Sequence, residues 1–180
     1  MRIIAGKYKR TPLVTLEGDL TRPTKDMVKE ALFDSLQIND GDSFLDLFSG
    51  SGSIGIEAIS RGATKVIFND FNKDAVKVIE TNLRKINEEA KVFNLNYEEC
   101  LFKLNDYPFN YIFLDPPYAF DEYENIFNLI NKYNLLLNKG IIIVEVKMTV
   151  DLNDEYYDFV KYKEKKYGIT KLLYYRKKEN

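Results

Sequence analysis

Three glycines and one aspartate in the first half of the chain have the types and spacing of a nucleotide-type cofactor site. Gly50, Gly52 and Gly55 follow an apolar run that ends at Phe48, and they satisfy the pattern G-x-G-x-x-G. These glycines permit a tight turn and a close ligand approach, and the N–H groups of a following helix suit a polar or anionic group. Asp70, twenty residues after Gly50, is spaced to bind a ribose hydroxyl.

This fingerprint alone does not separate NAD from S-adenosylmethionine (SAM), because both cofactors present a ribose diol. Asp46 lies inside the expected strand just before the turn and favours SAM. Its carboxylate would repel the pyrophosphate of NAD but suits the ammonium and sulfonium groups of SAM. We therefore expect a SAM site that contains Asp46, Phe48, Gly50, Ser51, Gly52 and Asp70.

A second motif, Asp115-Pro116-Pro117-Tyr118, ends another apolar run. Together with the glycine turn it resembles the amino-methyltransferases, which use SAM to methylate exocyclic amines of bases. The resemblance implies that Asp115 and a proline-stiffened backbone carbonyl accept hydrogen bonds from the two N–H groups of the amine. These bonds direct the nitrogen lone pair at the methyl group. It also implies that Tyr118 stacks on a base taken out of its helix. These four motif residues are the expected catalytic residues.

Alternating strands and helices are expected to position both motifs. Apolar runs predict strands at 44–48, 66–68, 92–96, 111–115 and 141–146. Helical spacing predicts helices at about 24–36, 53–60, 73–87, 97–104 and 123–137, with Gly140 at the turn after the last one. This alternation indicates a mostly parallel sheet covered on both faces. Two closely spaced strands, at 159–167 and 169–175, predict an antiparallel hairpin at its edge.

The expected fold class is therefore α/β, in the form of a Rossmann-like class I SAM methyltransferase. We expect a seven-stranded, mostly parallel sheet with an antiparallel C-terminal hairpin, helices on both faces and a short N-terminal β-ribbon. Residues 1–22 would form an N-terminal extension, and residues 23–180 would form a single methyltransferase domain.

The composition of the 180 residues, 45% hydrophobic and 30% charged, is typical of one globular domain. No apolar run approaches the roughly 20 residues needed to span a bilayer, so no membrane partner is expected. The single cysteine, Cys100, cannot form a disulfide within the chain, and histidine is absent. These counts argue against histidine-based triads and zinc sites, and they indicate a metal-free protein of a reducing cytoplasm.

The resemblance covers nearly the whole chain and narrows to the RsmD family. The residues that carry it are Arg2–Gly6, Thr21–Thr24 with Val28–Phe33, Asp46–Gly52, Asp115–Tyr118 and Lys165–Gly168. Membership implies methylation of N2 of a guanine in 16S rRNA on the small ribosomal subunit, with S-adenosyl-L-homocysteine as the second product. The family usually has Gly at Ala5, commonly Glu at Asp70, and usually an acid at Asn96 beside the adenine. The resemblance therefore implies that Asn96 contacts the cofactor.

Basic residues gather at both ends of a chain whose net charge is −2 and whose pI is about 5.4. Arg22, on a proline-stiffened loop, is expected to reach a phosphate or the substrate guanine. Lys7, Lys9 and Arg10 are expected to hold RNA backbone without reading sequence. Ordinary solvated surface charge is the alternative interpretation of these groups. The protein is expected to act as a monomer.

Three other functions stay open at this point. The D-P-P-Y motif also permits methylation of adenine N6 or cytosine N4 in DNA or RNA, although no target-recognition domain is visible. The glycine turn is equally compatible with an NAD-dependent oxidoreductase or NAD sensor. A non-catalytic RNA-binding module on a methyltransferase fold is the last alternative, which the intact Asp115–Tyr118 motif disfavours.

Overall fold

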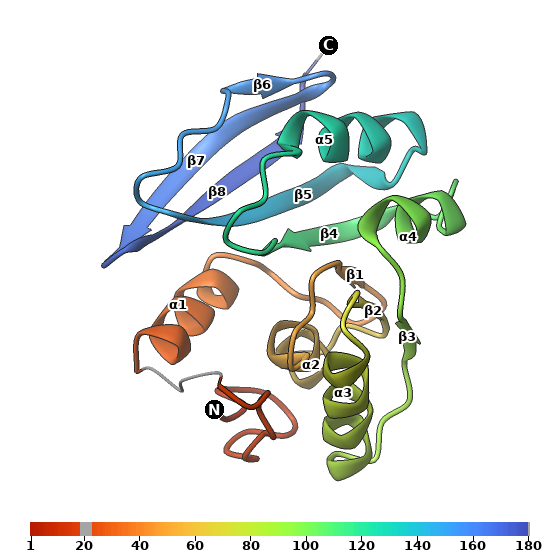
Figure 1. Cartoon of the computed structure of the whole chain (residues 1–180), viewed down its shortest axis with the longest axis vertical. Helices are drawn as coiled ribbons and strands as arrows, with labels where there is room; N and C mark the ends of the chain where they lie inside the picture. Colours follow the sequence, from red (N-terminus) through yellow and green to blue (C-terminus); the bar gives the residue numbers. More distant parts are fainter. Residues whose placement is uncertain (19–22, 180) are drawn as a thin grey trace.

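A computed structural model of the chain describes residues 1–18 and 23–179. Within these residues, one mixed sheet has eight strands in the order β3-β2-β1-β4-β5-β8-β7-β6 (Figure 1). Its parallel strands are β1 (Ser43–Asp46), β2 (Lys65–Asn69), β3 (Lys91–Phe93), β4 (Phe109–Leu114) and β5 (Leu136–Lys147). The antiparallel strands are β6 (Glu155–Tyr156), β7 (Phe159–Tyr167) and β8 (Thr170–Lys177).

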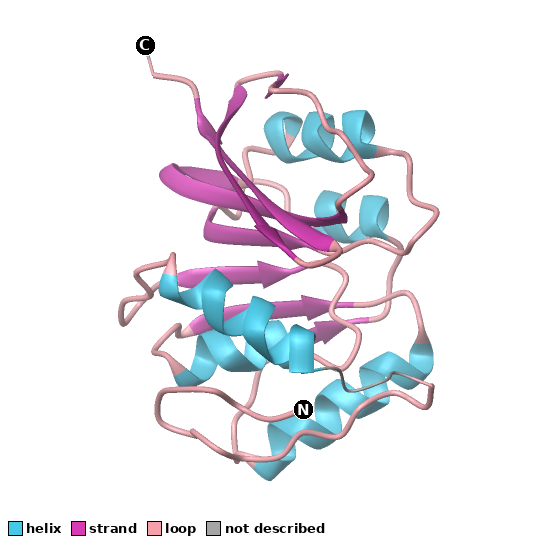
Figure 2. Ribbon diagram, turned by 90° about the vertical axis from the view of Figure 1, so that its left-hand side faces the viewer, coloured by secondary structure: helices cyan, strands magenta, loops and turns pink. Residues whose placement is uncertain are grey.

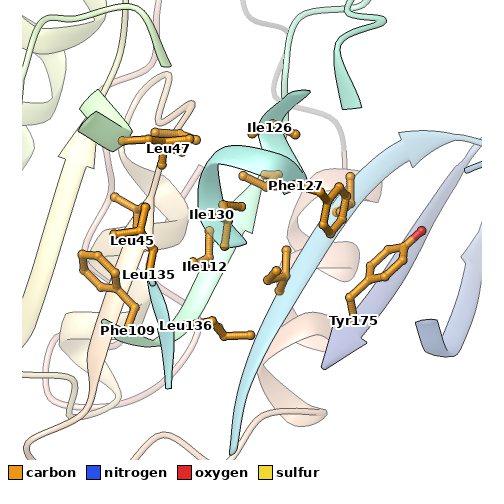
Figure 3. Packing of buried hydrophobic residues seen from close by; sticks show 14 of the residues in the cluster. Leu45, Leu47, Phe109, Ile112, Ile126, Phe127, Ile130, Leu135, Leu136 and Tyr175 are labelled. Atoms are coloured by element: carbon orange, nitrogen blue, oxygen red, sulfur yellow. The ribbon is translucent and has the colours of Figure 1, made fainter. Parts of the chain in front are cut away.

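Helices cover both faces of the parallel part of the sheet (Figures 1 and 2). One core contains side chains of α1 (Pro23–Asp34), α2 (Ser53–Ser60) and α3 (Lys73–Lys85), and the other contains side chains of α4 (Tyr97–Lys103) and α5 (Tyr123–Lys132). Successive strand residues point to opposite faces, so Phe44 belongs to the first core and Leu45 to the second. Figure 3 shows part of the second core, where Phe127 of α5 lies 4.7 Å from Tyr175 between ring centroids.

The strand order reverses at β1, which pairs in parallel with β2 on one side and with β4 on the other. A crevice forms outside the carboxyl ends of the strands at such a switch point, and ligands of open α/β sheets bind there. Asp46 ends β1 in register with Phe68 of β2 and Phe113 of β4. The topology therefore brings the glycine turn after β1 and the D-P-P-Y motif after β4 to the same edge.

The predicted α/β class with a C-terminal antiparallel hairpin is confirmed, and α2 has the predicted bounds. The predicted strand number was wrong, because the two-residue strand β6 adds an eighth strand within the described residues. The predicted ribbon at the N-terminus is reduced to one antiparallel bridge, between Arg2 and Pro12. None of the described helices is long and apolar enough to cross a membrane.

The predicted end of the last helix and the predicted turn at Gly140 were also wrong. α5 ends at Lys132, and Asn134 has a φ of +53°, the left-handed conformation that commonly stops a helix. β5 then begins at Leu136, so Gly140 lies inside the strand. Leu137, the last residue of the predicted helix, is 37% exposed on β5. Helical spacing of apolar residues thus continued by chance into a strand.

A buried polar network fixes the N-terminal segment, residues 1–14, against the helices of the first core. Glu57 of α2 accepts the backbone N–H groups of Ile4 (2.9 Å) and Ala5 (3.0 Å). Lys29 of α1 lies 3.7 Å from Glu57 and donates to the carbonyl of Arg2 (2.6 Å). Asn82 of α3 accepts the N–H of Val14 (2.8 Å) and donates to its carbonyl (2.9 Å). The side chains of Lys29, Glu57 and Asn82, which form this network, are all buried.

Candidate active site

A cavity of about 650 Å³ lies at the carboxyl ends of the central strands. It gathers residues from the turns after β1, β2, β3 and β4, as the switch-point topology requires. The predicted site residues in its lining are Asp46, Phe48, Gly50, Ser51, Asp70, Asn96, Asp115 and Pro117. The structure therefore brings the two sequence motifs together around one space.

Two glycines of the fingerprint are needed for the start of α2 and for its packing on the sheet. Gly52 is the N-cap residue of α2 and has a φ of +82°, a left-handed conformation that favours glycine. A Cβ atom at Gly55 would lie 2.3 Å from the ring of Phe68, so this glycine allows α2 to approach β2 closely. The cavity lining includes Gly50 and Ser51 but not Gly52.

Asp46 presents an unsatisfied carboxylate oxygen at the wall of this cavity. The residue is only 1% exposed, and its Oδ2 accepts the N–H of Gly55 at 3.0 Å. Its Oδ1 is buried and has no hydrogen-bond partner among the described residues. Burial raises the pKa of Asp46 to about 7, and the charges of Asp115 and Asp70 add to this rise. A buried carboxylate without a partner fits a ligand that supplies a cationic group.

Replacing Asp46 by asparagine is expected to stabilise the ligand-free protein above pH 7. The folded pKa of about 7 exceeds the ordinary aspartate value of 3.8, so the folded state binds the extra proton and stability falls as pH rises from about 4 to about 7. Asp46→Asn lacks this loss, so its gain in the free energy of unfolding should be larger at pH 8 than at pH 5 by on the order of 2–3 kcal/mol. Urea denaturation at pH 5 and pH 8 measures the difference, and an equal gain at both values would contradict the titration of Asp46.

Asp70 is held at the glycine turn by two backbone hydrogen bonds. Its Oδ2 accepts the N–H of Gly50, and its Oδ1 accepts the N–H of Asn72, both at 2.8 Å. The carboxylate therefore lies directly beside the turn, where the sequence predicted a ribose contact. Phe71, the next residue, also lines the cavity and is 79% exposed. Its ring is a surface on which a flat base could stack, a feature that the sequence analysis did not identify.

Asn96 lies at the predicted cavity, but its side chain also has a structural role. Its Oδ1 accepts the N–H of Glu99 at 2.9 Å and so caps α4. The turn before it is positioned by the buried Asn69, which donates to the carbonyls of Leu47 (3.2 Å) and Leu95 (3.0 Å). Asn69 thus ties the turns after β1 and β3 together, a role that sequence reasoning missed.

The D-P-P-Y motif lies where the first cavity meets a smaller one of about 240 Å³. Asp115 and Pro117 line both cavities, and Pro116 and Tyr118 line the smaller one. The carbonyl of Pro117 accepts the N–H of Phe120 at 2.9 Å. Tyr118 is 81% exposed, and the ammonium of Lys147 lies 3.4 Å from its ring centroid, which leaves the opposite face for stacking.

Glu145, on β5, is a site residue that the sequence analysis did not identify. It lines both cavities with Asp115, and Phe120 is a further shared lining residue. Burial raises the pKa of Glu145 to about 7, an effect that the positive charge of Lys25 opposes. The sequence signal was a single acid within the apolar run Ile141–Val146.

The electrostatic character of the larger cavity is acidic. Among the described residues in its lining, seven carry side-chain carboxyl groups and two carry side-chain ammonium groups. The ammonium groups belong to Lys25 and Lys29, and Lys29 already has Glu57 as a neighbour at 3.7 Å. Such a lining attracts a cation and repels a pyrophosphate. The acids are Asp26, Asp46, Asp70, Glu98, Asp115, Glu122 and Glu145.

The structure does not bring the predicted RNA-contacting residues of the N-terminal segment to this cavity. Lys7 donates its backbone N–H to the carbonyl of Ser60, the last residue of α2, at 2.8 Å. Its side chain lines another cavity and lies 3.9 Å from Glu88. Lys9 and Arg10 are exposed in the same turn. Arg22, predicted to reach the substrate, lies outside the described residues.

Comparisons with known proteins point to one group of relatives. Residues 1–176 match the family Cons_hypoth95, described as conserved hypothetical protein 95. YlbH of Bacillus subtilis, named as a candidate rRNA methyltransferase, is 36% identical over 99% of this chain and 100% of its own length. Ribosomal RNA small subunit methyltransferase D of Haemophilus influenzae is 37% identical over 82% of this chain and 79% of its own. The structure of YhhF from Escherichia coli, a candidate methyltransferase, superposes with a TM-score of 0.85 at 28% identity and covers 100% of this chain and 99% of that one.

Proposed function

The chain belongs to the Cons_hypoth95 family, the family of RsmD and YlbH, and on that premise we propose that it is a SAM-dependent rRNA methyltransferase. We propose further that it methylates N2 of a guanine in the 16S rRNA of the small ribosomal subunit and leaves S-adenosyl-L-homocysteine. The observation that carries the proposal is the meeting of Asp46, Asp70 and Asp115 around one acidic cavity. The reaction would take place in the cytoplasm, with one copy of the chain carrying the site.

The residues present fit SAM as the cofactor. The unpartnered Oδ1 of Asp46 lies beside the glycine turn and can accept an ammonium group. Asp70, fixed by the N–H of Gly50, can accept ribose hydroxyls, and Phe71 can cover the adenine. Asn96 and Phe48 would complete the adenine side of the cavity, and Gly50 and Ser51 would lie close to the bound ligand. SAM supplies a methyl group on a sulfonium, which makes the carbon electrophilic.

The chain's own residues orient the nucleophile. Asp115 accepts a hydrogen bond from one N–H of the guanine N2 amine. The carbonyl of Pro116 is the proposed acceptor for the other N–H, because the carbonyl of Pro117 already accepts the N–H of Phe120. These two acceptors draw the nitrogen lone pair out of conjugation and direct it into the larger cavity. The exposed face of Tyr118 stacks on the base. With SAM bound, the amine would gain one N–C bond in place of the S–C bond of the cofactor and would then lose a proton to solvent.

The test of this function is methyl transfer from labelled SAM to small subunits from cells that lack the protein, followed by mass mapping of the product. The expected product is one methyl group on N2 of a single 16S guanine. Label on adenine, on cytosine or on DNA would support methyl transfer from SAM but contradict guanine of 16S rRNA as the target. Binding of NAD without binding of SAM would favour the oxidoreductase alternative, against which the acidic cavity argues.

The exposed basic turn of the N-terminal segment is proposed to contact RNA backbone away from the reacting base. Lys9→Ala/Arg10→Ala should weaken binding to small subunits about 3- to 10-fold and lower the slope of log K against log salt by about 1 to 2. Catalysis by bound enzyme should be unchanged, because this turn lies beside the last residue of α2 and not beside the cavity.

Binding titrations between low and moderate salt measure this effect. Lys132→Ala/Lys139→Ala is the matched control, since both of its lysines are exposed and neither lines either active-site cavity. Equal affinity and salt slope for the two double variants would contradict an RNA contact by Lys9 and Arg10. Lys7→Ala tests the third predicted contact, whose ammonium group lies 3.9 Å from Glu88.

A further inference from the structure

Two carboxyl groups stand side by side at the point where the two cavities meet. β4 and β5 are parallel neighbours, with Leu114 in register with Val144. The next residues, Asp115 directly after β4 and Glu145 within β5, are therefore lateral neighbours, and adjacent strands lie about 4.8 Å apart. Both residues line both cavities, which places their carboxyl groups at the same substrate space.

Asp115 already has a place in the proposed chemistry, whereas Glu145 does not. Glu145 lies two residues before the end of β5, in register with Leu172 of β8, and its residue as a whole is partly buried. Asp115, Asp46 and Lys25 line the same cavity, and of these the positive charge of Lys25 acts on the Glu145 carboxyl group. A desolvated carboxylate in this position gains strongly from any hydrogen-bond donor that a ligand brings.

Only one of the amino bases offers two adjacent donors to such a pair. Guanine carries N1–H next to its N2 amine, so two acceptors side by side can each accept a hydrogen bond from the base. Adenine and cytosine carry a bare ring nitrogen next to the exocyclic amine, and a second carboxylate would face that lone pair. A flipped base is read through hydrogen bonds to this edge.

We propose that Glu145 is the residue that selects guanine, by accepting the N1–H of the target base while Asp115 accepts a proton of its N2 amine. This inference rests on the proposed methyl transfer and deepens it, because the choice of base then follows from the register of β4 and β5. It assigns a specificity role to Glu145 that neither the glycine turn nor the D-P-P-Y motif contains.

The test compares guanine with 2-aminopurine at the methylated position. 2-Aminopurine keeps the exocyclic amine at position 2 but has a bare N1 in place of N1–H. Small subunits are reconstituted with 16S rRNA that carries either base, introduced by ligation at the position that the wild-type protein methylates. Assays run at pH 8, above the pKa of about 7 of Glu145, so that the carboxylate form is present.

Wild-type protein is expected to prefer guanine over 2-aminopurine by about 100-fold or more in kcat/KM, because the carboxylate of Glu145 faces a lone pair in the analogue. Glu145→Gln should lose about 10- to 100-fold on guanine. The same variant should lose much less on 2-aminopurine, or gain, because an amide N–H can donate to the bare N1. The preference for guanine should therefore narrow by about 10-fold or more.

Two controls separate this role from general damage to the site. SAM affinity of Glu145→Gln, measured by calorimetry, should stay within about 3-fold of wild type, since the carboxylate reads the base. Glu155→Gln, an exposed glutamate of the edge strand β6, should keep the wild-type preference. If Glu145 had only a structural role, its substitution would lower kcat/KM for guanine and for 2-aminopurine equally and leave their ratio unchanged.

An unchanged ratio in Glu145→Gln, or equal methylation of both bases by the wild-type protein, would overturn the assignment while leaving the methyltransferase intact. Failure of the wild-type protein to methylate any guanine of the small subunit would instead contradict the proposed function. The two failures are thus distinguishable in the same experiment.

Discussion

Asp115→Ala is expected to lower the rate of methyl transfer at saturating substrate by about 10³-fold while leaving the fold unchanged. The loss is large because the amine is a weak nucleophile. The hydrogen bond that Asp115 accepts from it would strengthen as the nitrogen lone pair turns toward the methyl group. The fold should tolerate the change because Asp115 is exposed at the end of β4. We expect the free energy of unfolding to stay within about 0.5 kcal/mol of wild type.

Single-turnover methyl transfer to small subunits, together with urea denaturation, measures both expectations. Asp121→Ala is the matched control, since Asp121 is an exposed aspartate of the same connection between β4 and α5. The control should retain the wild-type rate. A rate for Asp115→Ala within about 10-fold of wild type would show that the carboxylate is not needed for orienting the amine, and a comparable loss in Asp121→Ala would point to the loop as a whole.

Glu57→Gln is expected to have the largest effect on stability, a loss of about 3–5 kcal/mol in the free energy of unfolding. The substitution keeps the shape of the side chain but removes the negative charge beside the buried ammonium of Lys29, 3.7 Å away. Burial already lowers the pKa of Lys29, and the charge of Glu57 opposes that shift. Without Glu57 the ammonium is an uncompensated buried charge, and the N–H groups of Ile4 and Ala5 lose part of their acceptor.

The same network supplies its own control. Arg61 pairs with buried Glu57 at 3.0 Å and with Asp34 at 3.5 Å, and the side chain of Asp34 is 67% exposed. Asp34→Asn therefore removes an exposed ion pair and should cost less than about 1 kcal/mol. Urea denaturation at pH 7 compares the two variants. A cost below about 1 kcal/mol for Glu57→Gln would mean that water or a shift of Lys29 relieves the buried charge.

The sequence was sufficient to predict the α/β class and the meeting of the two motifs. The glycine turn after one apolar run and D-P-P-Y after another require only that parallel strands share a carboxyl edge. Local signals of this kind depend on residue types within a few positions, such as Gly52 with its left-handed φ or Asn72 capping α3 through the N–H of Asp74. The residue roles at the site itself remain predictions.

Features that depend on distant pairing could not be predicted in this way. Glu145 becomes a neighbour of Asp115 only through the register of β4 with β5, which no local pattern states. Lys29 belongs to an amphipathic helix, where a charged side chain ordinarily faces solvent, and Glu57 is the single charged residue of α2. The N-terminal segment covers both, through contacts that join residues more than 50 positions apart at Glu57 and 27 positions apart at Lys29. The end of α5 was misplaced for a related reason, since Leu137 continues the spacing of Ile126 and Ile130 but belongs to β5.

The attachment of the N-terminal segment also sets an order of events during synthesis. Ile4 and Val14 leave the ribosome early, yet their hydrogen-bonding partners Glu57 and Asn82 follow 53 and 68 residues later. At elongation rates of roughly 5–20 residues per second, the segment waits about 3 to 14 s for them. Ile3 and Leu13, buried in the finished protein, stay exposed to water and to chaperones for that interval. The native contacts of this segment can therefore form only once the chain has been made through Asn82.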